Sequence, residues 1–114
     1  MSKRPVSLLI EDIWESVEKI ERYIGTETKE TFAQDEKTID AVARNLEIIG
    51  EAANRLPESF KSKYSEIEWI KIIGLRNRIV HNYFGIDLEI IWQILREDLP
   101  AFNSALQKIR EKNN

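Results

Sequence analysis

A long amphipathic helix is predicted by residues 35–56, which read DEKTIDAVARNLEIIGEAANRL. The apolar side chains in this stretch recur at three- and four-residue steps, the spacing that lines one face of an α-helix. They are Ile39, Val42, Leu46, Ile49, Ala53 and Leu56. Asp35 is a good N-cap, and Pro57 should end the helix because the residue before a proline avoids the helical region.

Gly50 lies inside this predicted helix, where a glycine costs about 1 kcal/mol relative to alanine. Its small size is therefore expected to serve a purpose. One reading is that a neighbouring helix packs closely against Gly50. The other is a close approach across a dimer interface or beside an active site.

The N-terminal part of the chain has the same periodicity. A helix is expected from about Ser7 to Ile24, because apolar residues line one of its faces, and Gly25 can take the left-handed conformation that closes a helix. Residues 25–34 are polar and are expected to form a loop. Residues 57–64 should form a short irregular or helical connector.

Two more helices are expected in the second half. The run Ser65-Glu66-Ile67-Glu68 fits a capping box, so a third helix should start there and fade between Tyr83 and Gly85. Its expected apolar residues are Ile67, Ile70, Ile73, Ile79 and Val80. Asp87 is a suitable N-cap for a last helix, and Pro100 should kink or restart that helix because proline lacks a backbone donor.

These patterns predict an all-α fold in one domain over residues 1–114. Helical periods with short to moderate connectors favour a compact up-and-down bundle of about four main helices, the last kinked near Pro100. No alternating strand pattern of useful length and no internal repeat occurs in the 114 residues.

Composition excludes several classes of site. The chain has no cysteine and a single histidine, so a disulfide framework is excluded and a transition-metal site within one chain is disfavoured. We expect no cofactor. The N-terminal residues do not form a signal peptide, and no apolar run approaches the ~20 residues of a membrane span, so the cytoplasm is the expected location.

The net charge of −3 argues against a protein that coats nucleic acid through bulk charge. It leaves room for an enzyme that binds a short stretch of RNA in a local basic cleft. Such a cleft would need Arg76 and Arg78 concentrated at one site.

Candidate chemistry gathers in one short run, Arg76-Asn77-Arg78-Ile79-Val80-His81-Asn82-Tyr83. His81 is the only histidine and thus the natural proton-transfer group, while an arginine offers a planar fork of donors that matches phosphate oxygens. On a helix, Asn77 and His81 would share one face and Arg76 would lie nearly in line with Tyr83. Arg76 and His81 would diverge by about 140°.

Residue types alone leave structural readings open. His81 could cap the last carbonyls of a helix or be a half-buried filler, and Tyr83 could be a packing aromatic with a wet hydroxyl. The pair Glu47 and Glu51 could be acid/base carboxylates, but solvated surface is the preferred reading. The tryptophans are interpreted as core or interface aromatics rather than base-stacking platforms: Trp14, Trp69 and Trp92.

The same run resembles the signature of HEPN-domain ribonuclease toxins of the HepT type, in which an arginine, four variable residues, a histidine, one variable residue and a tyrosine follow one another. Arg76, His81 and Tyr83 match that pattern. The resemblance covers most of the chain. It includes residues 40–53, similar to the family's second helix, and Trp92 with Asp98-Leu99-Pro100, similar to its last helix.

This resemblance implies an all-α HEPN-like bundle that forms a homodimer and acts as a metal-independent endoribonuclease toxin. It further implies catalytic roles for Arg76 and His81 and a supporting role for Asn77. Tyr83 would be the tyrosine that a partner antitoxin, a minimal nucleotidyltransferase of the MntA type, adenylylates. A non-catalytic, nucleotide-binding regulatory partner of such a nucleotidyltransferase is the alternative.

Overall fold

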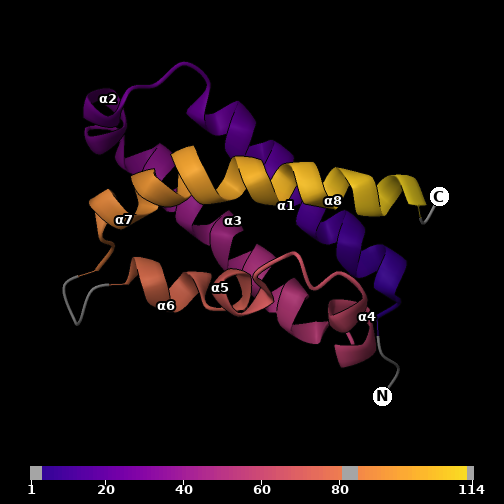
Figure 1. Cartoon of the computed structure of the whole chain (residues 1–114). Helices are drawn as coiled ribbons and strands as arrows, with labels where there is room; N and C mark the ends of the chain where they lie inside the picture. Colours follow the sequence, from indigo (N-terminus) through magenta and orange to yellow (C-terminus); the bar gives the residue numbers. More distant parts are fainter. Residues whose placement is uncertain (1–3, 81–84, 113–114) are drawn as a thin grey trace.

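The computed structural model describes residues 4–80 and 85–112, and these residues confirm the all-α prediction. Helices joined by short connections make up the described chain (Figure 1). The one β-type pairing found within the described ranges is an isolated antiparallel bridge between Val80 and Ile86. No described helix is both long and apolar enough to cross a membrane.

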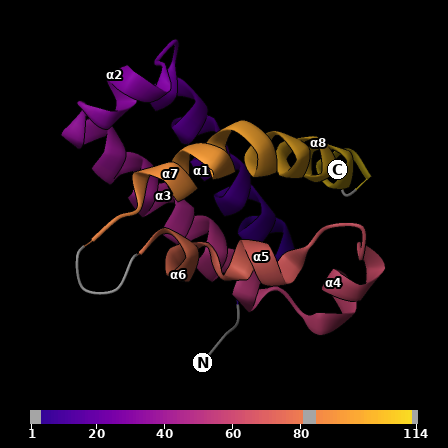
Figure 2. The ribbon, with the colours of Figure 1, turned by 60° about the vertical axis from the view of Figure 1, so that its left-hand side comes forward.

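Two long helices form the base of the bundle, α1 (Val6–Ile24) and α3 (Glu36–Arg55). They run antiparallel and pack along each other (Figure 1 and Figure 2). Their bounds confirm the two predicted helices. The N-cap is also confirmed, because the Asp35 carboxylate accepts a hydrogen bond from the Thr38 backbone N–H at 3.1 Å. Gly25 closes α1 with a φ of 53°.

The polar stretch between these helices holds a short helix, α2 (Lys29–Ala33), so the prediction of a plain loop was wrong. Thr28 and Thr31 form a reciprocal capping box that starts α2. Phe32 then turns into the core and packs against Trp92, with ring centroids 5.4 Å apart. One buried aromatic in a polar stretch was too weak a signal to predict a helix.

The predicted third helix is two short helices, α5 (Trp69–Ile73) and α6 (Leu75–Ile79), which follow the connector helix α4 (Glu58–Lys63). The proposed capping box at Ser65 was wrong, because residues 64–66 form a turn and the next helix begins only at Trp69. The indole Nε1–H of buried Trp69 donates to the carbonyl oxygens of Lys61 and Tyr64, both at 3.1 Å. This anchor starts the helix at Trp69 instead.

The break at Gly74 also changes which apolar residues are buried. Ile70, expected in the buried stripe, is 88% exposed, whereas Ile72 and Leu75 are buried. The prediction assumed one continuous helix, in which these apolar residues would all lie on the same buried face. The set of buried residues predicted from Ile67 onward was therefore wrong in part.

The last helical region confirms the predicted interruption near Pro100. It consists of α7 (Leu88–Gln93), a π-helical segment η1 (Ile94–Asp98) and α8 (Leu99–Lys112). The Leu99 N–H bonds to the Ile94 carbonyl, five residues back. Pro100 has no N–H to continue the four-residue ladder, so the helix widens just before it. Asp87 caps α7, as predicted.

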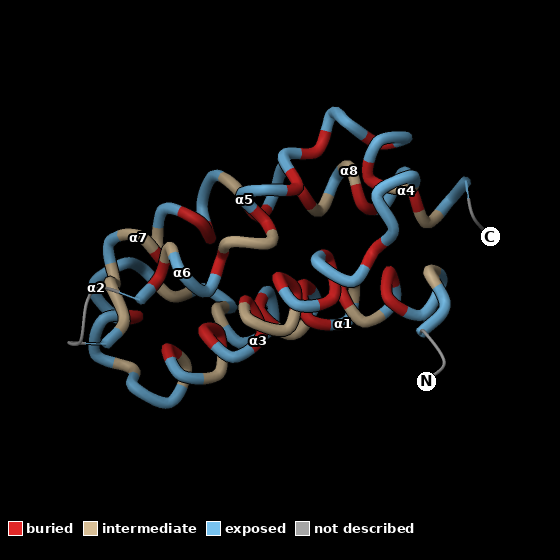
Figure 3. The backbone as a smooth tube through the Cα atoms, turned by 90° about the horizontal axis from the view of Figure 1, so that it is seen from below, coloured by how far each residue is buried: buried red, intermediate tan, exposed pale blue. Residues whose placement is uncertain are grey.

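The core lies where α1, α3, the α5–α6 pair and α8 face one another. Figure 3 shows buried positions alternating with exposed ones along α1 and α3, as expected for helices with one buried face. The tryptophans pack as interpreted: Trp69 is buried edge-on against Phe102, and Trp14 lies under the Arg110 guanidinium at 4.3 Å.

Gly50 marks a close approach of α3 to α5. A methyl group at this position would lie 3.0 Å from the carbonyl oxygen of Ile73 and 3.2 Å from that of Ile72. The close-packing reading is therefore confirmed. Since α5 leads through one residue into α6, this contact also sets where α6 lies on α3.

Candidate active site

The structure describes part of the predicted catalytic run. Arg76, Asn77 and Arg78 lie on α6, whereas His81 and Tyr83 fall within residues 81–84, outside the described residues. Because α6 ends at Ile79 and Val80 is extended, with φ −91° and ψ 124°, the expectation of a helix through Tyr83 was wrong. The expected alignments of Asn77 with His81 and of Arg76 with Tyr83 assumed one continuous helix, which the described residues do not form.

The chain on either side of residues 81–84 meets at one place. Val80 pairs with Ile86, and the Asp87 N–H donates to the Ile79 carbonyl at 2.6 Å. Gly85 has a φ of 97°, a conformation that favours glycine. The described residues that flank the segment carrying His81 and Tyr83 therefore lie together at the C-terminal end of α6, one turn beyond Arg76.

Arg76 presents its guanidinium at the surface, with 65% of its side chain exposed. Its Nε–H donates to Glu47 Oε1 of α3 at 3.2 Å. Within the described ranges this is the one hydrogen bond of the Arg76 side chain. Its two terminal amino groups are therefore not used by any other described residue. A side-on contact of this kind holds the arginine and leaves the end of its fork for an anion.

Glu47 contacts a second arginine. Its Oε2 lies 3.7 Å from Nη1 of Arg44, one turn earlier on α3. Reading Glu47 as plain solvated surface was therefore wrong, since its side chain is only 30% exposed and links α3 to α6. Glu51 is exposed, as expected. The sequence did carry a signal for this contact. Glu47 lies one turn from Gly50, on the side of α3 that another helix approaches, so its side chain could have been expected to meet that helix.

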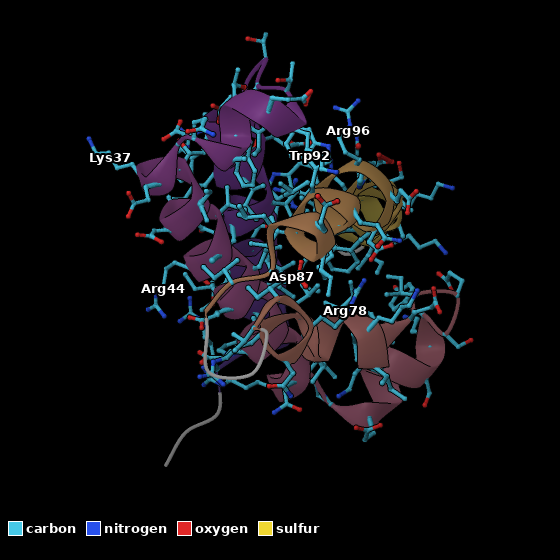
Figure 4. All side chains as sticks on the ribbon, turned by 90° about the vertical axis from the view of Figure 1, so that its left-hand side faces the viewer. Lys37, Arg44, Arg78, Asp87, Trp92 and Arg96 are labelled. Atoms are coloured by element: carbon cyan, nitrogen blue, oxygen red, sulfur yellow. The ribbon has the colours of Figure 1, made fainter. Side chains whose placement is uncertain are left out.

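Arg78 serves a different contact. Its Nη2 donates to Asp98 Oδ2 of η1 at 2.7 Å, and both side chains are partly buried. Residues two apart on a helix point about 200° apart, so Arg76 and Arg78 cannot share a face. Figure 4 shows Arg44 and Arg78 on opposite sides of α6. The expected concentration of Arg76 and Arg78 at one site is not found.

Arg78 instead lines a small cavity of about 160 Å³ between α5 and α8. Lys71, Asp98 and Phe102 share this cavity. Asn77, the predicted supporting residue, is exposed on α6 next to Arg76. Among the residues that the structure describes, no three His, Cys, Asp or Glu side chains gather in a way that could hold a metal ion.

Comparison with known proteins supports the resemblance of this sequence to HepT-type ribonucleases. The family model described as "Ribonuclease HepT-like" matches residues 13–109. A protein of Thermococcus cleftensis named "Probable ribonuclease HepT" is 38% identical over 109 residues, which cover 96% of this chain and 99% of that protein. A Methanocaldococcus jannaschii protein named "Putative RNase MJ0127" is 41% identical over 109 residues, covering 96% of this chain and 90% of that protein.

No solved structure matches this chain. The family assignment thus rests on sequence, over nearly the whole described fold. The match spans the α3 segment that carries Arg44 and Glu47 as well as the run from Arg76 to Tyr83. The chain therefore belongs to the ribonuclease HepT-like family.

Proposed function

We propose that this protein is a metal-independent endoribonuclease and the toxin of a toxin–antitoxin pair. Arg76 and His81 are its catalytic residues, and Asn77 supports them. The observation that carries this proposal is the exposed Arg76 guanidinium, held through Nε by Glu47 one turn before Val80, which pairs with Ile86 on the other side of residues 81–84. That arrangement suits an enzyme that binds a phosphodiester of an extended substrate at its surface.

The proposed reaction is attack from within the RNA. A base takes the proton of a 2′-hydroxyl, the 2′-oxygen attacks the adjacent phosphorus, and the bond from phosphorus to the 5′-oxygen breaks as an acid protonates that oxygen. The products are a 2′,3′-cyclic phosphate and a 5′-hydroxyl. His81 supplies acid/base catalysis, and Arg76 stabilises charge on the phosphoryl oxygens.

One histidine cannot be base and acid at the same instant. A homodimer would bring two sets of Arg76 and His81 to one groove, which supports a dimeric active form. The proposed antitoxin is a MntA-type nucleotidyltransferase that adenylylates Tyr83. The added phosphate would place negative charge two residues after His81 and compete with RNA for the local arginine.

Cleavage of RNA by purified protein without antitoxin tests the proposal. We expect cyclic-phosphate ends from RNA and no cleavage of DNA, which lacks the 2′-hydroxyl. His81→Ala should lower the rate by roughly 10²–10⁴, and Arg76→Lys should also be severely impaired because lysine loses the fork. Unimpaired cleavage by His81→Ala would refute the catalytic assignment. Nucleotide binding without turnover would favour a regulatory protein instead.

A further inference from the structure

A pair of arginines from two different helices meets at one carboxylate. Arg76 of α6 contacts Oε1 of Glu47 and Arg44 of α3 contacts Oε2, so both guanidinium groups lie within 4 Å of the same side chain. Two positive charges then face one negative charge. The group of three side chains carries a net charge of +1, on a protein whose overall net charge is −3.

Both arginines remain accessible to a large ligand. The side chains of Arg44 and Arg76 are 68% and 65% exposed, whereas the Glu47 side chain between them is 30% exposed. The carboxylate thus lies deeper than the two groups it contacts. An anion arriving from solvent would meet the guanidinium groups before it met Glu47.

The two contacts differ in kind. Arg76 donates a hydrogen bond from Nε at 3.2 Å, which fixes the orientation of its guanidinium plane. Arg44 approaches at 3.7 Å, too far for a hydrogen bond, so its donors are held near Glu47 without being used by it. Asp40 and Glu51 share the exposed side of α3, but within the described residues neither forms an ion pair with Arg44.

We propose that Glu47 orients Arg76 beside Arg44 and so forms a phosphate clamp, in which Arg44 binds the RNA backbone phosphate next to the scissile one. This inference deepens the proposed function and rests on it for the identity of the substrate. Arg44 is a binding residue in this scheme. Glu47 is a positioning residue, because it acts through the Arg76 guanidinium and does not touch the RNA.

Arg44 is tested by binding rather than by turnover. The probe is a short single-stranded RNA with 2′-O-methyl groups, which cannot supply the attacking hydroxyl, and its affinity is measured by fluorescence anisotropy at several salt concentrations. Arg44→Ala should weaken binding about three- to tenfold and reduce the slope of log affinity against log salt by about 0.7, the value for one lost phosphate contact on a single strand.

Arg55→Ala is the matched control. Arg55 is exposed on the same helix, eleven residues and thus about 16 Å from Arg44, and its replacement removes the same charge. We expect this variant to bind the RNA like the wild type. Equal effects of Arg44→Ala and Arg55→Ala would reduce the clamp to general electrostatic attraction and overturn the proposal.

Glu47 is tested by separating turnover from binding. Glu47→Ala should lower kcat by about ten- to a hundredfold, because a misplaced catalytic group is costly, while the methylated RNA binds equally well or more tightly once a negative charge is gone. Glu47→Gln keeps an oxygen that accepts the Nε–H bond, so it should recover much of the lost kcat. A purely structural role would weaken kcat and binding together, and that result would refute the positioning role.

These measurements separate the two proposals. If the wild type does not cleave RNA but binds the probe through Arg44, the nuclease proposal fails and Arg44 keeps only its role as a phosphate-binding residue. If the wild type cleaves RNA and Arg44→Ala matches it in affinity and salt slope, the clamp fails and the nuclease stands. A wild type that does not bind the probe at all also rejects the clamp.

Discussion

The contact at Gly50 gives a stability prediction that runs against helix propensity. Alanine is favoured over glycine inside a helix by about 1 kcal/mol, so Gly50→Ala should stabilise α3 if nothing opposed it. However, the added methyl group would lie 3.0 and 3.2 Å from two backbone carbonyl oxygens of α5. Backbone atoms cannot swing aside as a flexible side chain can, and overpacking of this kind costs about 1–3 kcal/mol.

We therefore expect Gly50→Ala to be less stable than wild type by about 0–2 kcal/mol, with about 1 kcal/mol as the central value. For a domain of this size a loss of about 1 kcal/mol corresponds to roughly 4 °C in Tm. Urea unfolding followed by circular dichroism measures it. The added methyl group should also push α5, and with it α6, away from α3. The Glu47–Arg76 contact should then loosen, and RNA cleavage should fall.

The neighbouring exposed position supplies the control. The difference in stability between Glu51→Ala and Glu51→Gly measures the preference of α3 for alanine where no helix approaches. Gly50→Ala should fall below that reference by about 1–3 kcal/mol. If instead it stabilised the protein by the full amount seen at residue 51, the close approach of α5 to α3 would not constrain the fold.

Four further outcomes are expected, two from described contacts and two from the proposed function. Arg78→Ala should lower stability by about 1 kcal/mol through loss of the Asp98 pair, yet leave the salt dependence of RNA binding unchanged, and a reduced salt slope would contradict this. Cleavage should persist in excess EDTA, and loss of activity that magnesium restores would overturn the metal-independent mechanism. Tyr83→Phe should keep much of the cleavage activity but escape antitoxin control, as judged by cleavage assays after co-expression and by mass spectrometry of the Tyr83 peptide. Desolvation, together with nearby Asp35, raises the pKa of Glu27, so the ionised form of Glu27 destabilises the fold. Glu27→Gln should therefore raise Tm at neutral pH. This gain should shrink as the pH falls through the titration range of glutamate, because wild-type Glu27 is then protonated as well.

The long helices could be predicted because several local signals agree along them. In α3, an N-cap at Asp35, a stripe of apolar residues and Pro57 all point to the same bounds, and the structure adopts them. The interruption near Pro100 was also predictable, because proline lacks the backbone donor that a regular helix needs at that position.

The α5–α6 region could not be predicted from local signals. Its start depends on the Trp69 indole reaching two carbonyls of the preceding turn, and its break at Gly74 is supported by the approach to Gly50. Both contacts join parts of the chain that a helical period does not connect. The partner of Glu47 is likewise distant, since Arg76 follows 29 residues later, and only Gly50, one turn away on α3, indicated that another helix approaches there.

The π-helical segment gives the last helix an unusual dependence on its own length. A π turn accommodates one more residue than an α turn, so Ile94–Asp98 takes up a residue that a regular helix would place in the next turn. Deleting a single residue there would let α7 and α8 join as one regular α-helix while α8 keeps its present face toward the core, because the deletion removes the residue that the wide turn absorbs. Regular α geometry without a deletion would instead rotate α8 by about 100° relative to α7 and swing Phe102 and Leu106, now buried, out of the core. The structure therefore tolerates a one-codon deletion in this stretch, whereas substitutions that force a regular α turn there would turn the two halves of the helix away from the same hydrophobic face.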